Sequence, residues 1–336
     1  MVTEKTLSHV SVLGAGAWGT VLANLIARTG RQVTLIARDE ETAATIEADR
    51  ENARRLPGTK LADGVLVTAR NNATVDAYVY AAPAQHAREH FDRLSSLVTM
   101  GASTPVVIAS KGIEVTTGRF LWEVLEEVWP TARPFVLSGP TFAHDIAAGL
   151  PAAATLAGKT SELLDPVRDV FSAPAFRLYP STDLMGVSLG GAAKNVLAIA
   201  AGVASGAGLG ESARAAIIAR GFAEVRRLGV ALGVADETLQ GLSGLGDLIL
   251  TATSPASRNT ALGMRIGKGA SVKDALAQGT AISEGVKTAT AILLRAQKNN
   301  VEMPVCSSVV DLLSEKRPLT QIVEELLRRP PSDEAG

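Results

Sequence analysis

The sequence at residues 9–19, HVSVLGAGAWG, decides the fold. It opens with HVSVL, a mostly apolar stretch of five residues, which predicts a buried strand. Three glycines follow in the spacing G-x-G-x-x-G, and they are Gly14, Gly16 and Gly19. After them, residues 20–28 predict a helix. A strand, a glycine-rich turn and a helix in this order predict the first part of a β-α-β unit.

The rest of the first half repeats this alternation of strand-like and helical segments. Short apolar runs rich in Val, Ile and Tyr predict strands at residues 10–13, 33–37, 77–80, 106–109 and 135–137. Such runs are typical of strands that are buried on both faces of a parallel sheet. We therefore expect an α/β fold whose N-terminal domain, residues 1–185, is a Rossmann-type doubly wound parallel sheet. Ligands of such sheets bind at the carboxyl ends of the strands.

The pattern changes after about residue 184, where the strand-like runs stop. Helical spacing in Ala- and Leu-rich sequence predicts helices at residues 213–232, 286–298 and 320–329. A capping box, Ser271-Val-Lys-Asp274, predicts the start of a further short helix. We expect an all-helical substrate and catalytic domain over residues 186–330 and a disordered tail over residues 331–336.

Composition narrows the class of protein. The chain has 336 residues, enough for two domains at ~100–200 residues each. Its formal net charge of -1 gives no support for a nucleic-acid or membrane partner. One cysteine, Cys306, fits a reducing compartment, and because residues 1–6 carry charges with no apolar run behind them, we expect no signal peptide. The apolar stretch 184–210 contains Lys194, which favours a buried helix over a membrane span. We expect a cytoplasmic protein.

The glycine turn predicts a dinucleotide cofactor, although a tight turn without a ligand has the same three glycines. Glycines let the backbone approach a pyrophosphate, whose charge meets the helix N-terminus. The second strand ends at Arg38-Asp39, where a carboxylate would bind the ribose of NAD and an arginine the 2′-phosphate of NADP. Arg38 favours NADP, and Asp39 keeps NAD open. Lys111 and the segment Ser138-Gly139-Pro140-Thr141 follow two later strands, so both should face the cofactor, although most such lysines are only solvated.

Two isolated charges predict the reactive centre. Lys194 is the only charged residue between Asp183 and Glu211, and Asp247 is the only one between Glu237 and Arg258. An unpaired buried charge is costly, so pairing the two would satisfy both. Burial lowers the pKa of an amine and a nearby carboxylate raises it, which together suit proton transfer. A purely structural ion pair between helices is the alternative.

A few residues further on, Ser257-Arg258-Asn259 places a guanidinium beside an amide. Such a pair can bind phosphate through charge-assisted forked bonds, although most Arg-Asn pairs are ordinary surface. The histidines His86 and His90 lack the partners of a zinc set, so we expect no metal. The one G-x-S-x-G spacing, at residues 186–190, lies within the apolar stretch expected to be a helix and not at a strand-to-helix turn, so it gives nucleophilic hydrolysis little support.

Taken in order, these pieces resemble the bacterial NAD(P)-dependent glycerol-3-phosphate dehydrogenases. The matching stretches are GAGAWGT at 14–20, SKGIE at 110–114, SGPTFA at 138–143, GGAAKNV at 190–196, GLGDLILT at 244–251 and SRN at 257–259. The Lys-Asn and Gly-Asp blocks are the specific ones. The resemblance implies hydride transfer between NAD(P)H and dihydroxyacetone phosphate, giving sn-glycerol 3-phosphate for phospholipid synthesis. It also implies a homodimer.

The resemblance implies roles for single residues. Lys194 would donate the proton to the ketone oxygen, and Asp247 and Asn195 would position it. The other implied substrate contacts are Lys111, Gly139, Thr141, Ser257, Arg258 and Asn259. The implied cofactor contacts are Gly14, Gly16, Ala17, Trp18, Gly19, Arg38, Lys111, Ala143, Arg258, Ile282 and Glu284. Two alternatives stay open: a related reductase of another small hydroxy acid, and a catalytically inactive NAD(P)-sensing protein.

Overall fold

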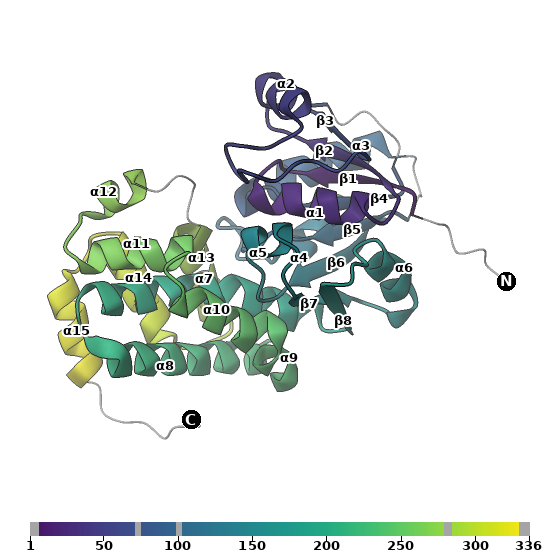
Figure 1. The fold of residues 1–336 in the computed structure, drawn as a ribbon. Coiled ribbons are helices and arrows are strands. Elements are labelled where there is room, and N and C mark those ends of the chain that lie inside the picture. The colour runs from purple at the N-terminus through teal and green to yellow at the C-terminus, as the bar shows by residue number, and fades with distance from the viewer. Residues whose placement is uncertain (1–6, 71–74, 99–102, 279–283, 329–336) are drawn as a thin grey trace. The chain divides into compact units, whose positions relative to one another are not determined.

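The computed structural model describes residues 7–70, 75–98, 103–278 and 284–328, and it divides into two compact units (Figure 1). The first unit comprises Met1–Lys111 and Phe120–Ser188. The second comprises Gly112–Arg119 and Leu189–Gly336, so a short segment of the first half packs with the helices of the second half. The tail at residues 331–336 lies outside the described residues.

The first unit is built on a sheet that has eight strands within the described residues, in the order β3-β2-β1-β4-β5-β6-β7-β8. The strands are β1 (His9–Leu13), β2 (Gln32–Ile36), β3 (Val65–Thr68), β4 (Ala77–Tyr80), β5 (Pro105–Ile108), β6 (Arg133–Ser138), β7 (Ala152–Gly158) and β8 (Phe176–Ser181). All neighbours from β3 to β6 are parallel, β7 runs antiparallel to β6, and β8 is parallel to β7. The predicted Rossmann-type sheet is confirmed, and it also contains β3 and an extension, β7 and β8, that the sequence did not predict.

Helices cover both faces of this sheet (Figure 1). They are α1 (Ala17–Ala27), α2 (Glu40–Asp49), η1 (Ala84–His86), α3 (Ala87–Leu97), α4 (Leu121–Val128), α5 (Ala143–Ala147), η2 (Ser161–Leu163) and α6 (Leu164–Asp169). Strand alternation assigns side chains to two cores. Val12 packs in one core with Leu22 of α1, and the next residue, Leu13, packs in the other with Phe91 of α3.

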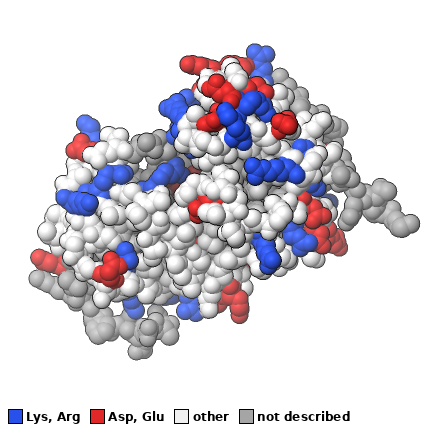
Figure 2. Space-filling model, viewed as in Figure 1, with Lys and Arg blue, Asp and Glu red and all other residues white. Residues whose placement is uncertain are grey.

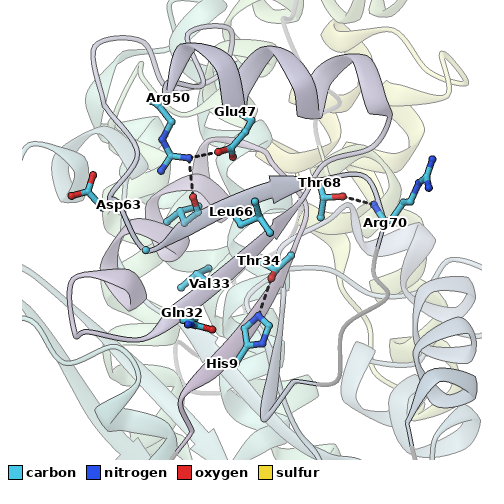
Figure 3. A pocket seen from close by; sticks show the side chains of 12 residues that line it. His9, Gln32, Val33, Thr34, Glu47, Arg50, Asp63, Leu66, Thr68 and Arg70 are labelled. Atoms are coloured by element: carbon cyan, nitrogen blue, oxygen red, sulfur yellow. Dashed lines mark hydrogen bonds and ion pairs between the residues drawn. The ribbon is translucent and has the colours of Figure 1, made fainter.

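The outer edge of β3 is closed by an ion pair from α2 (Figure 3). The carboxylate of Glu47 accepts the N–H of Val67 at 2.7 Å, and Arg50 donates to the carbonyl of Val65 at 2.9 Å. Glu47 and Arg50 also bond each other at 2.7 Å. Unpaired edge groups invite another strand, and here charged side chains occupy them.

Apart from the non-helical segment Gly112–Arg119, the regular structure of the second unit is helical within the described residues. The helices are α7 (Leu184–Gly206), which begins in the first unit, then α8 (Gly210–Ala231), α9 (Asp236–Gln240), the π-helical turn η3 (Leu242–Gly246), α10 (Asp247–Thr253), α11 (Arg258–Gly267), α12 (Val272–Ala277), α13 (Glu284–Lys298), α14 (Pro304–Leu313) and α15 (Leu319–Arg328). The predicted helical domain is confirmed, and Ser271 caps α12 by accepting the N–H of Asp274 at 3.1 Å.

The helix α7 is long and apolar enough to cross a membrane, but 89% of its most apolar window is buried inside the protein. It contacts α11 backbone to backbone. A Cβ atom on Gly202 of α7 would overlap the carbonyl oxygen of Thr260, and one on Gly263 of α11 would overlap that of Ile199. Glycines at these positions let the two helices approach more closely than side chains allow.

Candidate active site

The glycine turn follows β1, and the structure explains its three glycines in different ways. Gly14 has a φ of +109°, and a Cβ there would lie 2.8 Å from the backbone of Ala81 and Ala82 after β4. A Cβ on Gly19 would overlap the carbonyl oxygen of Gly14, whereas one on Gly16 would meet no atom within 4 Å. The first and third glycines are therefore required by the turn itself, and Gly16 leaves open space beside it.

The helix α1 begins at Ala17, earlier than the predicted residue 20, so Ala17, Trp18 and Gly19 form its first turn. No side chain caps this N-terminus. The first N–H groups of a helix lack acceptors within the helix and attract anions. The indole Nε1 of Trp18 is buried and has no hydrogen-bond partner among the described residues. These features fit a dinucleotide whose pyrophosphate lies at the start of α1.

One residue that the sequence analysis missed holds this turn in place. Asn52 is buried, and its amide donates to the carbonyl of Ala15 at 3.0 Å and to Oγ1 of Thr20 at 2.8 Å. The hydroxyl of Thr20 in turn donates to the carbonyl of Gly16 at 2.8 Å. Because Asn52 lies in a loop without periodic pattern, no sequence signal indicated it.

The two charged residues that follow β2, Arg38 and Asp39, differ in how firmly the protein holds their side chains. Asp39 caps α2 by accepting the N–H of Thr42 at 2.8 Å, and it bonds Arg38 at 2.9 Å. These hydrogen bonds to Thr42 and Arg38 lower the pKa of Asp39 to about 2. The side chain of Arg38 is 82% exposed. The carboxylate is thus held by the protein itself, while most of the guanidinium faces solvent.

Two further predicted residues meet at the carboxyl ends of β5 and β6. The amine of Lys111 donates to the carbonyl of Gly139 at 2.9 Å, and the hydroxyl of Thr141 donates to the same oxygen at 3.2 Å. A Cβ on Gly139 would lie 2.6 Å from Cα of Ala154 in β7, so the antiparallel strand requires glycine there. Ala143 is the first residue of α5 and is half-buried.

The predicted pairing of the isolated charges is present in the second unit. Nζ of Lys194, in α7, lies 2.7 Å from Oδ1 of Asp247 and donates at 2.9 Å to Oγ1 of Thr251. The Lys194 side chain is 10% exposed and that of Asp247 is 1% exposed. Buried ion pairs of this kind hold both groups in one geometry, because separating them would leave a charge without compensation.

A glycine one helical turn before Lys194 explains why α7 and α10 meet there. A Cβ on Gly190 would lie 2.7 Å from the carbonyl oxygen of Ser243, in the π-helical turn η3 that leads into Asp247. Residues four apart share one face of a helix, so the close contact at Gly190 brings Lys194 to the start of α10.

Three further predicted residues of the second unit lie at the start of α11. Ser257 caps this helix by accepting the N–H of Thr260 at 3.3 Å, and Arg258 is exposed. The amide of Asn259 donates to Oδ1 of Asn195 at 2.9 Å. Glu284 is the half-buried first residue of α13. Ile282 lies outside the described residues.

A groove of about 910 Å³ over β2 and β3 is a separate feature (Figure 3). None of the predicted site residues that the structure describes lines it, and its basic residues Arg50 and Arg70 are paired with Glu47 and Glu40. Figure 2 shows acidic and basic side chains intermixed over α2 and its surroundings, and a mostly uncharged surface over the helices of the second unit.

Known proteins resemble this chain over nearly its whole length. The family described as NAD-dependent glycerol-3-phosphate dehydrogenase N-terminus matches residues 9–164, and the corresponding C-terminus family matches residues 183–324. A glycerol-3-phosphate dehydrogenase [NAD(P)+] of Azorhizobium caulinodans is 48% identical over 98% of this chain and 100% of its own length. One from Hyphomonas neptunium is 46% identical over 96% of each chain.

The same likeness holds in three dimensions. The crystal structure of glycerol-3-phosphate dehydrogenase from Coxiella burnetii superposes with a TM-score of 0.92 at 35% identity, covering 96% of this chain and 99% of that one. Sequence and structure thus agree over both units, and the chain belongs to the family of NAD-dependent glycerol-3-phosphate dehydrogenases.

Proposed function

We propose that this protein reduces dihydroxyacetone phosphate to sn-glycerol 3-phosphate with NAD(P)H, and that Lys194 is its proton donor. The observation that carries the proposal is the buried contact between Lys194 and Asp247. A buried amine whose position is fixed by a carboxylate and by the hydroxyl of Thr251 suits transfer of one proton at one place.

The reduced nicotinamide, when bound, supplies a hydride to C2 of the substrate. Negative charge grows on the C2 oxygen as the C–H bond forms, and Lys194 donates a proton to that oxygen from Nζ. The ketone becomes a secondary alcohol, and the amine is left neutral until it regains a proton from solvent. In the reverse direction Lys194 accepts the proton of the alcohol. Asp247 is a positioning residue in this account, because its carboxylate binds the amine. Asn195 is a proposed substrate contact, and its side chain bonds Asn259.

Binding of the remote phosphate keeps C2 near the reacting groups. Arg258 is exposed at the first position of α11, where its guanidinium can bind a phosphate with two parallel bonds. Asn259 and Ser257 flank it, and Lys111, Gly139 and Thr141 supply contacts at the end of the sheet. Such contacts use binding energy away from C2 to restrict the reacting geometry.

The cofactor is NAD(P), in keeping with the family. The glycine turn and α1 would hold the pyrophosphate, with Trp18 beside them. Since Asp39 caps α2 and bonds Arg38, we propose that Arg38 meets the ribose 2′-phosphate and that NADP(H) is preferred. The remaining proposed cofactor contacts are Lys111, Ala143, Arg258, Ile282 and Glu284. Residues 1–185 then act as the dinucleotide-binding domain and residues 186–330 as the substrate domain.

We further propose that the protein works in the cytoplasm as a homodimer and provides the glycerol backbone of phospholipids, as its relatives' family implies. The direct test of the activity is an initial-rate assay with dihydroxyacetone phosphate, comparing NADH and NADPH. Oxidation of either nucleotide with formation of sn-glycerol 3-phosphate is expected. A substrate panel with ketopantoate and 6-phosphogluconate, in the matching reaction direction, separates the related reductases. No nucleotide turnover with dihydroxyacetone phosphate would overturn the proposal.

A further inference from the structure

Three helices of the second unit meet at two buried amide side chains. Asn195 belongs to α7 and Asn259 to α11, and Gly285 is the second residue of α13. The side chain of Asn259 donates from Nδ2 to Oδ1 of Asn195 at 2.9 Å. Its Oδ1 accepts the backbone N–H of Gly285 at 3.3 Å. Both asparagines are less than 9% exposed.

The N–H of Gly285 fixes which way the Asn259 amide points. A residue in the first turn of a helix has no acceptor within the helix for its N–H. The carbonyl end of the Asn259 side chain must face this donor, so its NH₂ end faces the oxygen of Asn195. The backbone N–H of Gly285 in α13 therefore orients the Asn259 amide on α11, which in turn binds the Asn195 amide on α7.

Only glycine permits this contact at position 285. A Cβ there would lie 2.7 Å from Oδ1 of Asn259, 2.8 Å from the carbonyl oxygen of Asn195 and 2.9 Å from Cδ1 of Ile199. Real Cβ atoms essentially never approach other atoms closer than 3.0 Å. Any side chain would push the start of α13 away from both helices and break the hydrogen bond to Asn259.

We propose that Gly285 is a positioning residue for substrate phosphate, acting through Asn259. The inference rests on the proposed function, in which Asn259 and its neighbour Arg258 hold the phosphate of dihydroxyacetone phosphate. When Gly285 orients the Asn259 amide correctly, the phosphate is bound in the pose that the reaction needs. When that orientation is lost, substrate binding weakens while the Lys194–Asp247 pair remains.

The experiment compares Gly285→Ala, Asn259→Ala and the double variant with the parent enzyme. Gly285→Ala is expected to raise KM for dihydroxyacetone phosphate about tenfold or more, with kcat within about threefold. It should weaken calorimetric binding of sn-glycerol 3-phosphate equally and leave the NADPH Kd within about twofold. In the Asn259→Ala background, the same substitution should change KM by less than about twofold, because the two residues act as one unit. A merely structural defect would instead reduce the active fraction, which lowers kcat and leaves KM unchanged.

Gly229→Ala is the matched control, because it adds a methyl group to another buried helix glycine of this unit and crowds only the end of Leu239. Its KM is expected to equal that of the parent. If Gly285→Ala does not fold, the pair Ile199→Val and Gly285→Ala replaces it, since valine lacks the crowding Cδ1 atom. An unchanged KM in a folded Gly285 variant, or additive effects with Asn259→Ala, would overturn the inference. Failure of the parent enzyme to reduce dihydroxyacetone phosphate would instead overturn the proposed function.

Discussion

Nζ of Lys194 lies 2.7 Å from Oδ1 of Asp247, although 53 residues separate the two in sequence. Each group is nearly enclosed, and the hydroxyl of Thr251 bonds both, at 2.9 Å to the amine and at 3.3 Å to the carboxylate. A buried carboxylate without a cation is strongly destabilising, so the pair holds the amine in one place. The relationship is what makes a proton-transfer role for Lys194 testable.

Lys194→Ala removes the proposed proton donor. We expect kcat to fall by about 10³, because general acid catalysis contributes roughly 10²–10⁴ in rate. The NADPH Kd, measured by fluorescence titration, should stay near that of the parent. Lys268→Ala replaces an exposed lysine of the same unit and serves as the control, with unchanged kinetics expected. A kcat for Lys194→Ala near that of the parent contradicts the assigned role.

Arg258→Ala removes the guanidinium that is proposed to anchor the phosphate. Charge-assisted hydrogen bonds contribute about 1.5–3 kcal/mol, so KM for dihydroxyacetone phosphate should rise by roughly 10- to 100-fold. Steady-state kinetics at saturating cofactor measures this. Arg258→Lys should recover only part of the loss, because an ammonium lacks the forked geometry. A KM equal to that of the parent would show that the phosphate binds elsewhere.

Arg38→Ala tests the choice of cofactor. Because Asp39 is held by Thr42 and by Arg38 itself, we expect the guanidinium to interact with the 2′-phosphate that only NADP carries. The KM for NADPH should rise about tenfold and that for NADH by less than about twofold. The measurement is the ratio of kcat/KM for the two nucleotides. An equal change for both would remove Arg38 from the recognition of the 2′-phosphate.

Asn52→Leu tests the support of the glycine turn. The substitution keeps the size of a buried side chain but removes its hydrogen bonds to Ala15 and Thr20, leaving these oxygens with fewer donors. Both cofactors should bind about tenfold more weakly, since the shared turn is affected, and KM for dihydroxyacetone phosphate should change little. Equal binding of NADH and NADPH by the variant and the parent would show that the turn needs no support from Asn52.

Glu224 of α8 predicts a pH dependence of stability. It is 2% exposed, and its carboxylate accepts the N–H groups of Val305 at 2.7 Å and Cys306 at 3.2 Å at the start of α14. Burial is the largest influence and raises the pKa of Glu224 to about 7, although these two bonds and Arg227 lower it. Burial and the nearby Glu224 also raise the pKa of the Cys306 thiol well above its ordinary value.

The protons bound by the folded and the unfolded chain determine whether the free energy of unfolding rises or falls with pH. Between pH 4.5, the ordinary pKa of a glutamate, and about pH 7, the folded protein keeps a proton that the unfolded chain has released. The free energy of unfolding should therefore fall as pH rises through this window, by up to about 3 kcal/mol, and level off above it. Urea unfolding at several pH values measures the trend. Glu224→Gln should flatten it, and an unaltered slope in that variant would assign the trend to other groups.

Much of this architecture is readable from local sequence, and the exceptions have physical causes. Most of the parallel strands are rich in apolar residues, so β1, β2, β4, β5 and β6 were predicted. The short parallel strand β3 was not. β7 is rich in alanine, which does not favour strands, and it forms because Gly139 admits Ala154 at close range. β8 contains Pro180, which marks a strand as unsuitable for a sheet interior but is tolerated at the edge, where β8 lies.

The site also contains some residues that the sequence predicted and others that it did not. Lys194 and Asp247 were predicted to pair because each is the only charge in a long apolar stretch, and an isolated charge needs a partner. Asn52 and Gly285 were not predicted. Both act through residues that are distant in sequence: Asn52 bonds Thr20 at 2.8 Å, and the N–H of Gly285 bonds Asn259 at 3.3 Å. A single uncharged amide or a single glycine in the sequence does not indicate such contacts.

The direct backbone contact of α7 with α11 has a consequence for motion during turnover. Gly202 and Gly263 leave no side-chain layer between the two helices that could deform or slide. The backbones that carry Lys194 on one helix and Arg258 on the other are therefore held at a fixed distance by this contact. Whatever rearrangement admits substrate and releases product must carry the two helices together.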